Sequence, residues 1–385
     1  GGFDAVIGNP PYSNYSSRGS MRAFYARSSL VAELASLNAA IEYCSRAYAQ
    51  VSNGCKDLYK WFAYKGLQLV AKEGAFGFIM PNTWFTHTKY ADLKRAVLDI
   101  AGDLQVIDAG FGVFAPTVPT CLLICRKALG RKRWYADLKG EADKAGALKS
   151  GPSRRDLAGD GTVPEPPIVV KYLRRWPDHR RLKAYVTLRE GQHIKRQSLH
   201  VGRAPENLPV IDSKNMGRYR FHWEPSYSYP ARQSGAKRFK RTRGERLLVR
   251  KTGDRIVAAI APEDESYVLQ SLYQGLDVHP EVGAKYVLGL LNCRLLTFLY
   301  QNSRFGQRGR TMAQFRKGYL DELPIRTIDF SDPADVARHD RMVALVERML
   351  ALHRQLAAAK TPTAKTTLQR QIVATDRQID RLVYE

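Results

Sequence analysis

Asn9, Pro10, Pro11 and Tyr12 directly follow the apolar run 3–8, and their types and order could do chemistry on an amino group. A short apolar run closed by glycine is typical of a buried parallel strand, and functional groups collect just past such strand ends. Two successive prolines fix the backbone, so the Asn9 side-chain oxygen and the Pro10 carbonyl can accept from both N–H bonds of one exocyclic amino group. This would aim the nitrogen lone pair at an electrophile without a general base. Tyr12 adds a flat face for a base.

The elements that must position this loop are expected to alternate between strand and helix, which is typical of α/β folds. A long segment from 13 to 54 interrupts the alternation directly after the loop, and it is expected to be helical around Leu30 to Tyr48. For the tetrapeptide itself, a purely structural alternative stays open, in which the two prolines only stiffen a turn and no chemistry occurs. Apolar patterning predicts strands at 3–8, 75–80, 104–109 and 121–126, and helices near 55–72 and 89–101.

Several further segments follow the tetrapeptide in a recognisable order and spacing. They are 55–62, 74–84, 112–116, 121–125, 247–251 with 257–259, and 288–292. Together with Asn9 to Tyr12, they resemble the gamma-class N6-adenine DNA methyltransferases of restriction-modification systems, in particular the Taq-type and type IIG enzymes. The resemblance covers nearly the whole chain. It implies an α/β fold, with a partial Rossmann-like methyltransferase sheet followed by an α+β target-recognition domain and a C-terminal helical hairpin.

The resemblance also implies roles for individual residues. Asn9 and Pro10 would accept from the amino group of a flipped adenine, which would stack between aromatic side chains. The cofactor would be S-adenosylmethionine, with apolar contacts to its adenine ring. Phe62 has an alternative role in core packing, because it lies on an apolar helical stripe. The residues that match the family's catalytic positions are Asn9, Pro10, Tyr12 and Phe114, and those that match its cofactor-binding positions are Pro11 and Phe62.

One departure from the family concerns the start of the chain. In the family, the Gly-rich loop and the acidic residue that hold the cofactor precede the Asn-Pro-Pro-Tyr motif, whereas eight residues precede it here, beginning Gly-Gly. The resemblance therefore implies a fragment that lacks part of the cofactor site. The family's other strands would cover an exposed edge of the sheet, so we expect the fragment to be less stable than its parent.

Composition independently favours a nucleic-acid partner. The chain has 61 Lys and Arg against 37 Asp and Glu, a formal net charge of +24. Residues 131–330 hold 39 basic and 21 acidic side chains, whereas 1–130 hold 13 and 9 and 331–385 hold 9 and 7. We therefore expect the middle of the chain to face double-stranded DNA, through phosphate contacts that weaken as salt rises.

Basic excess alone does not separate DNA from RNA, and a solvated or disordered loop is an equal alternative for the dense run at 237–243. Arg250 and Lys251 end an apolar strand, so they would project from a rigid element. The run 304–310 mixes glycine, arginine and an aromatic residue, as a loop that follows a nucleic-acid backbone would. The residues expected to bind DNA are Arg250, Lys251, Arg304, Arg308, Arg310, Lys237 and Arg238.

Length predicts two or three domains. The stretch from Lys139 to Pro167 is rich in Gly, Ala, Lys, Ser and Pro and is the best linker candidate. Past Pro333, apolar residues recur at helical spacing on both sides of Pro362, which predicts a helical hairpin packed on the recognition domain. The expected division is 1–135 for the C-terminal half of the catalytic domain, 136–184 for a linker region, 185–330 for the target-recognition domain and 331–385 for the hairpin.

Other chemistries leave little trace. Five cysteines without a Cys-x-x-Cys pair favour free thiols in the reducing cytoplasm of a prokaryotic cell, with Cys121 and Cys125 on one buried strand face. The eight histidines show no ligand spacing, so no metal is expected. No run of apolar residues is long enough to span a membrane, and no membrane partner is expected.

Together, these expectations predict a site-specific adenine DNA methyltransferase that acts on a flipped base within a restriction-modification or phage-defence system. Two alternatives stay open. One is a non-catalytic DNA-binding specificity fragment, and the other is an RNA or protein-glutamine methyltransferase that shares the tetrapeptide. The large basic region at 185–330 counts against the second. A nuclease, fused or separate, could lie outside these residues, and the recognition sequence cannot be deduced from them.

Overall fold

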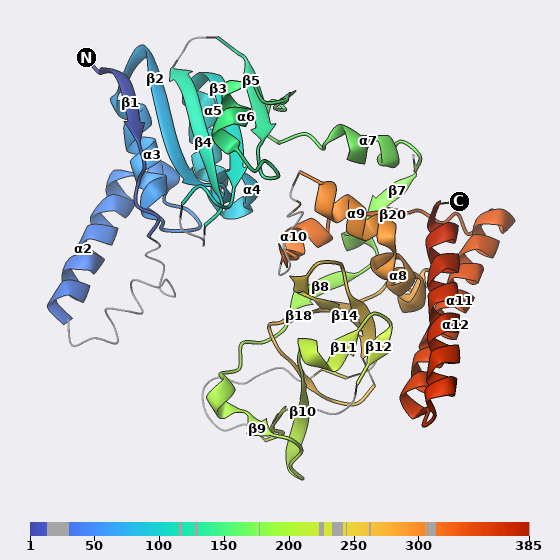
Figure 1. Cartoon of the computed structure of the whole chain (residues 1–385). Coiled ribbons are helices and arrows are strands. Elements are labelled where there is room, and N and C mark those ends of the chain that lie inside the picture. The colour runs from blue at the N-terminus through green and yellow to red at the C-terminus, as the bar shows by residue number, and fades with distance from the viewer. Residues whose placement is uncertain are drawn as a thin grey trace. The chain divides into compact units, whose positions relative to one another are not determined.

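The chain forms two compact units in the computed structural model, Gly1–Glu165 (unit 1) and Pro166–Glu385 (unit 2) (Figure 1). The structure describes residues 1–13, 31–114, 118–127, 130–176, 178–222, 227–232, 242–243, 245–261, 263–304, 306 and 313–384.

Unit 1 is built on a six-stranded sheet with the order β1-β2-β4-β3-β5-β6. β1 pairs parallel with β2, β3 pairs parallel with β5, and β4 lies antiparallel between β2 and β3, so β1, β2, β3 and β5 all run in one direction. Their carboxyl ends therefore lie at one edge of the sheet. All four predicted strands form. The strands are β1 (Phe3–Gly8), β2 (Val70–Pro81), β3 (Ala101–Gly110), β4 (Thr120–Lys127), β5 (Arg133–Asp137) and β6 (Arg154–Asp156).

Alternating side chains give the two faces of this sheet different helical partners. Cys121 and Cys125 of β4 are buried on the face that packs on α3 and α5, as expected for these two cysteines. Leu122 and Ile124 point to the opposite face, toward Ala147 of α6. The two predicted helices form, but α3 ends before 72 because β2 begins at Val70. The helices are α2 (Val31–Ala47), α3 (Leu58–Leu69), α4 (Thr83–Thr86), α5 (Ala91–Ile100) and α6 (Lys144–Lys149).

The expected burial of β1 was wrong. The apolar run predicted a buried parallel strand, and its pairing is parallel, but it is not buried: Phe3 is 61% and Ile7 84% exposed. The reason is position, because β1 is an edge strand among the described residues and has β2 as its neighbour on one side. A continuous apolar run does not distinguish a central strand from an edge strand.

Unit 2 contains two four-stranded sheets, with the orders β17-β10-β13-β9 and β16-β14-β18-β8, and helices that pack on the second. This α+β arrangement is the one predicted. Its strands are β7 (His179–Arg181), β8 (Thr187–Glu190), β9 (His200–Val201), β10 (Asn207–Ile211), β11 (Met216–Gly217), β12 (Arg220–Phe221), β13 (Tyr227–Pro230), β14 (Arg246–Arg250), β15 (Thr252–Gly253), β16 (Ala258–Ala261), β17 (Tyr267–Val268), β18 (Leu272–Leu276), β19 (Ala313–Gln314) and β20 (Pro324–Arg326). Its helices are α7 (Pro167–Leu173), α8 (Gly283–Asn292), α9 (Arg294–Asn302), α10 (Lys317–Leu320), α11 (Pro333–Ala358) and α12 (Pro362–Tyr384).

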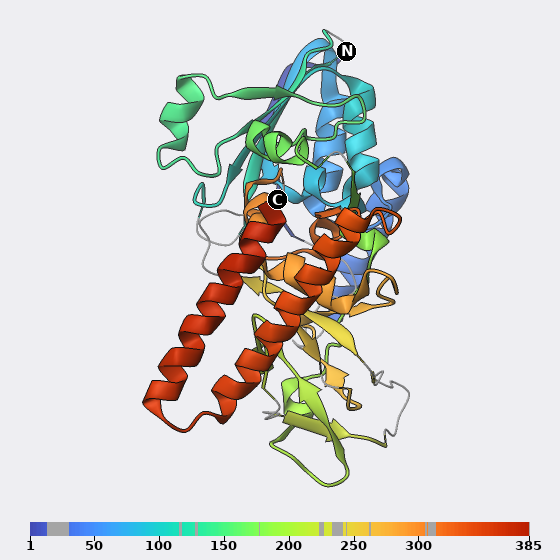
Figure 2. The same ribbon diagram turned by 90° about the vertical axis from the view of Figure 1, so that its right-hand side faces the viewer.

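The helices α11 and α12 form the predicted C-terminal hairpin, and they lie side by side along unit 2 (Figure 2). Their apolar sides join the same core as β14, β18 and α8. Gly289 of α8 permits this packing, because a Cβ there would lie 2.7 Å from the Met342 sulfur and 2.9 Å from Val346. The hairpin is therefore part of unit 2, as expected.

Two ion pairs fasten α12 to the rest of unit 2. The Arg218 guanidinium donates to both carboxylate oxygens of Asp376, at 2.9 and 2.6 Å, and to the carbonyl of Asn292 at 2.6 Å. Asp380 accepts from the backbone N–H of Arg294 at 2.9 Å and lies 3.1 Å from that residue's Nε. Both acidic side chains of α12 thus point toward the protein.

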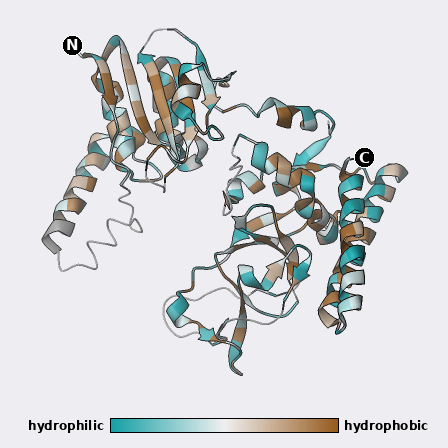
Figure 3. Ribbon diagram, in the orientation of Figure 1, coloured by the Kyte–Doolittle hydropathy of each residue, from teal (hydrophilic) through white to brown (hydrophobic). Residues whose placement is uncertain are grey.

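Hydrophobic residues are concentrated in the strands of unit 1, whereas hydrophobic and hydrophilic residues are mixed along α11 and α12 (Figure 3). No helix in the described part of the chain combines the length and the hydrophobicity that a membrane span needs. The boundaries of the four predicted domain ranges stay predictions.

We expect the stability of unit 2 to depend on His353 of α11. Burial, Arg220 and Arg218 lower the pKa of this imidazole to about 4, and its buried Nδ1 has no hydrogen-bond partner in the described structure. Because the folded pKa lies below the unfolded value of about 6.5, the stabilisation is complete above pH 6.5 and is lost as pH falls toward 4. Urea unfolding from pH 7 to 4 should therefore show a smaller loss of stability for His353→Leu than for the wild type. The exposed His193→Leu serves as the control, and equal losses in all three proteins would contradict the assignment.

Candidate functional site

The candidate site lies where the parallel strands of unit 1 end. Asn9 follows β1, Asn82 follows β2, and the loop that carries Phe114 follows β3. Since these strands share a direction, the three segments leave the same edge of the sheet. β1 and β3 are three strand spacings apart, about 14 Å, so the loops must bridge this distance above the sheet.

The loop after β1 is hydrogen-bonded to the rest of unit 1 at its C-terminal end, whereas its first residue is exposed. Asn9 is exposed, and its side-chain amide has no hydrogen-bond partner among the described residues. Pro10 is buried, and Tyr12 donates its hydroxyl hydrogen to the carbonyl of Ile79 in β2 at 3.2 Å. The carbonyl of Ser13 accepts from the N–H at the start of α3 at 2.9 Å. The backbone around the Asn9 amide is therefore fixed, while the amide itself remains available to a ligand.

Tyr12 rests on a layer of aromatic and acidic side chains. Tyr59 of α3 meets it edge-on, with ring centroids 6.4 Å apart, and the Tyr59 hydroxyl pairs with that of Thr83 at 3.0 Å. Tyr90 stacks on Tyr59 at 5.7 Å and donates to the buried carboxylate of Asp57. Burial raises the pKa of Tyr12 to about 12, so its hydroxyl stays protonated and keeps its bond to the β2 backbone.

Asp108, at the end of β3, connects the strand ends. Its Oδ1 accepts from the side-chain amide of Asn82 and from the N–H of Gly110, each at 3.1 Å. Its Oδ2 accepts from the Tyr135 hydroxyl at 3.2 Å and lies 3.6 Å from the Lys139 ammonium. Burial raises the pKa of Asp108, and Lys139 opposes that shift. One carboxylate thus joins the loop after β2 to β3 and β5.

The two aromatic side chains expected beside the base and the cofactor are both accessible. Phe114, in the loop after β3, is 47% exposed, and Phe62, on α3, is 49% exposed. The core-packing alternative for Phe62 accounts for only part of its surface. The N–H of Asn82 bonds to the carbonyl of Pro119 at 2.9 Å, which fixes the far end of the Phe114 loop. Residues 115–117 of this loop lie outside the described residues.

The structure describes three of the seven residues that were expected to contact DNA. Arg250 donates to the backbone carbonyls of Ser213 and Met216, at 2.9 and 2.5 Å. Lys251 forms an ion pair with Glu190. Both side chains thus have partners inside unit 2, and their contact with DNA stays a prediction. Arg304 is half-buried. The other four, Lys237, Arg238, Arg308 and Arg310, lie outside the described residues.

Sequence reasoning did not single out Arg196 and Tyr227. The exposed Arg196 lies beside β9, an edge strand of its sheet; its Nε donates to the Tyr227 hydroxyl at 3.0 Å, and its guanidinium lies 5.5 Å from the ring centre. An arginine ordered against an aromatic ring is a suitable contact for nucleic acid. The available signal was the run Gly191–Pro205, which contains Lys195, Arg196 and Arg203 and no acidic residue. Asp108 was also missed, although an acidic residue at the end of an apolar strand is a recognisable pattern.

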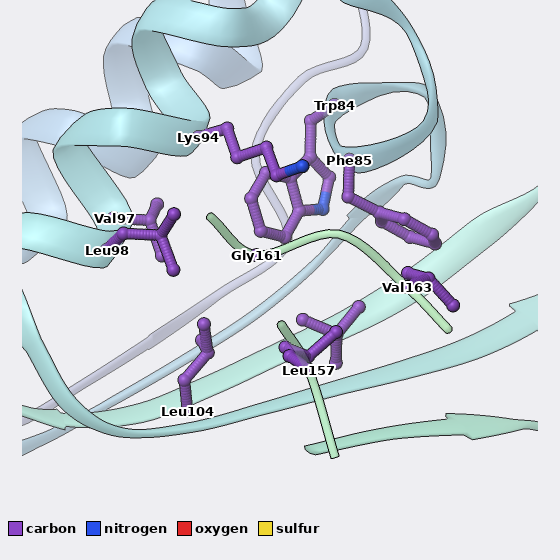
Figure 4. A pocket seen from close by; sticks show the side chains of 10 residues that line it. Trp84, Phe85, Lys94, Val97, Leu98, Leu104, Leu157, Gly161 and Val163 are labelled. Carbon is purple, nitrogen blue, oxygen red and sulfur yellow. The ribbon is translucent and has the colours of Figure 1, made fainter. Parts of the chain in front are cut away.

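A small pocket in unit 1 lies between α5 and the sheet (Figure 4). Trp84, Phe85, Leu98 and Leu157 surround it, and Lys94 extends along its rim. Its volume of about 10 Å³ holds at most one water molecule, so we interpret it as a packing space rather than a ligand site.

We expect Asp108→Ala to lower the free energy of unfolding of unit 1 by about 2–4 kcal/mol, because it leaves buried donors on Asn82, Gly110 and Tyr135 without an acceptor. Asp108→Asn keeps one acceptor oxygen and should cost less. Asp137→Ala is the matched control, since this carboxylate also pairs with Lys139, at 3.1 Å, but is more exposed. Urea unfolding measures all three, and equal losses for Asp108→Ala and Asp137→Ala would show that Asp108 does not hold the strand ends together.

Comparison with known proteins gives two family matches. Residues 1–114 match the Eco57I restriction-modification methylase family, and residues 208–325 match the TaqI-like C-terminal specificity domain. No curated protein matches the chain.

Among solved structures, the DrdV–DNA complex matches with a TM-score of 0.52 at 11% identity, over 92% of this chain and 45% of that chain. A nuclease-deletion mutant of the Type ISP restriction-modification enzyme LlaGI, in complex with a DNA substrate mimic, matches with a TM-score of 0.47 at 10% identity, over 90% and 35%. The type IIG restriction endonuclease BpuSI matches with a TM-score of 0.33 at 12% identity, over 87% and 50%.

The chain spans half or less of the length of these three proteins. At these identities the structural likeness concerns the fold alone. The two family matches cover the candidate site and the β-rich middle of unit 2. Residues 1–114 are therefore similar to the Eco57I restriction-modification methylases, and residues 208–325 are similar to the TaqI-like C-terminal specificity domain.

Proposed function

We propose that the protein of which this chain is a part transfers a methyl group to N6 of an adenine in double-stranded DNA, within a restriction-modification or phage-defence system. The observation that carries the proposal is the exposed Asn9 amide at the end of β1. It has no partner among the described residues, although the loop around it is fixed to β2 and α3. A fixed acceptor without a partner suits a substrate amino group.

In this proposal, Asn9 Oδ1 and the Pro10 carbonyl accept the two N–H bonds of the adenine amino group. The nitrogen lone pair is then directed out of the ring plane. The new N–C bond would form as the bond between the methyl carbon and the cofactor sulfur breaks, which leaves a neutral thioether, and the nitrogen would then release one proton to solvent. The target adenine must leave the duplex to reach this position, and stacking on Tyr12 and Phe114 replaces the stacking that it loses. The hydrogen bond of Tyr12 to Ile79 and its contact with Tyr59 support this role, because they hold the ring in one orientation.

The residues present fit S-adenosylmethionine at the apolar surface beside the loop. Phe62 is 49% exposed and Pro11 is also exposed, so both can cover the adenine ring of the cofactor. When bound, the cofactor supplies the methyl group as an electrophile. Phe62 and Pro11 would contribute binding and the exclusion of water.

The DNA partner is supported by charge and by the specificity-domain match. Residues 131–330 carry a net charge of +18, and the matched residues 208–325 lie within them. We also place the protein in a prokaryotic cytoplasm, because its five cysteines are free thiols, which a reducing compartment favours. A non-catalytic DNA-binding specificity fragment is the alternative, and it differs in predicting DNA binding without methylation.

Asn9→Ala in the intact parent gene should reduce methylation by at least about 10²-fold, the usual effect of removing one preorganised hydrogen-bonding group. The test is single-molecule sequencing of N6-methyladenine in DNA from a methylation-free host that expresses each variant. Asn53→Ala removes an exposed amide elsewhere in unit 1 and should leave methylation unchanged.

Each outcome assigns the function differently. Methylation at one short motif that disappears in Asn9→Ala supports the adenine reaction and the role of Asn9. Unmethylated DNA with a folded, DNA-binding wild-type protein supports the specificity fragment. Unmethylated DNA without DNA binding would refute the proposal and favour RNA or protein substrates.

A further inference from the structure

The outward face of α12 carries basic charge that the protein does not neutralise. Arg370, Arg377 and Arg381 are exposed, and none of them forms an ion pair or hydrogen bond with the described residues. Their spacings of seven and four residues place them within one narrow strip of the helix. At 1.5 Å per residue, the strip is about 16 Å long.

Within the described helices α11 and α12, every acidic side chain has a partner in the protein. In α12, Asp376 pairs with Arg218 and Asp380 with Arg294, so both point inward. The acidic residues of α11 also have partners within the protein, which are Arg326 and Arg338 for Asp335, His339 for Asp340, and Lys285 for Glu347.

The sequence between Glu347 and Asp376 contains basic residues but no acidic ones. From Arg348 to Thr375 no acidic residue occurs, whereas five basic residues do. Arg341 and Arg348 of α11 are likewise exposed without an ion pair in the described structure. In α12 the charges are therefore separated, because Asp376 and Asp380 face the protein whereas the three arginines face outward.

The strip is also rigid. Ile379, Leu382 and Val383 of α12 are buried in the core of unit 2. Arginines on a fixed helix lose less conformational freedom on binding than arginines in a loop. This arrangement suits a polyanion with regularly spaced charges.

We propose that the strip Arg370–Arg377–Arg381 on α12 binds the phosphate backbone of duplex DNA. Its length of about 16 Å exceeds the roughly 12 Å width of a major groove, so its ends can reach phosphates on both sides of that groove. The strip lies outside the residues that match the specificity domain, 208–325, so its contact adds affinity rather than base recognition. This inference rests on the proposed DNA substrate.

The test uses the intact parent protein and its triple variant Arg370→Gln, Arg377→Gln, Arg381→Gln. Binding to a fluorescein-labelled duplex of about four helical turns is measured by anisotropy over a range of salt concentrations. Each lost phosphate contact should lower the steepness of log Kobs against log salt by about 0.9, so the triple variant should lose about 2–3 in slope. The matched variant with lysine at the same three positions keeps the charge and should keep the slope.

The outcomes separate this inference from the proposed function. If the wild-type protein binds the duplex and the glutamine variant shows the same slope, the proposed phosphate contact of the strip is wrong, whereas the proposed function is unaffected. A wild-type protein that neither binds the duplex nor methylates DNA overturns the proposed function. An equal loss of slope in the lysine and glutamine variants would also contradict the strip as a phosphate contact. Thermal unfolding confirms that both variants are folded, as expected for exposed positions.

Discussion

The buried carboxylate of Asp108 is the constraint on which the candidate site depends. It lies at the end of β3 and accepts hydrogen bonds from Asn82, Gly110 and Tyr135. Burial raises its pKa, so its charge is tolerated because donors and the Lys139 ammonium surround it. A group in this position cannot move without leaving several polar atoms unsatisfied. The loop ends around it are therefore fixed, whereas Phe114, which is half-exposed, is free of that core.

The Asn9 loop shows the same division between a fixed frame and an open functional group. Tyr12 and Ser13 are bonded to β2 and α3, whereas the Asn9 amide faces solvent. A solvated amide costs no desolvation energy in the free protein, and a substrate amino group can replace its water. In the proposed reaction, the frame would act by orientation, because it fixes the backbone that carries both proposed acceptors before the base arrives.

Much of the architecture followed from the sequence, because apolar periodicity reports strands and helices directly. The strands β1 to β4, the helix α3 and the hairpin of α11 and α12 lie where the pattern predicted them. The edge position of β1 did not follow, since an apolar run looks alike in central and edge strands. The inward bonds of Arg250 to Ser213 and Met216 could not be foreseen either, because they join segments that are distant in sequence.

The residue types of the candidate site could be predicted from the sequence, but the contacts that hold those residues in place could not. The motif Asn9 to Tyr12 was evident from the sequence, whereas the contact of Tyr12 with Tyr59 and the hydrogen bonds of Asp108 depend on how distant segments meet. Charge distribution along the chain pointed to the middle as the part that faces DNA. It could not show that α12 separates its charges across its two faces, because that separation arises from the inward ion pairs of Asp376 and Asp380.

The most direct test of the central claim is whether the protein extrudes its target base toward Asn9. The intact parent protein would be bound to a duplex with 2-aminopurine in place of the target adenine, and its fluorescence recorded. Stacking within the duplex quenches this base, so extrusion should raise its emission, and the same motif with the probe one position away should show no rise. Tight and specific binding without any rise in emission, also when Tyr12 and Phe114 are both replaced by alanine so that the extruded probe cannot stack on them, would contradict the account.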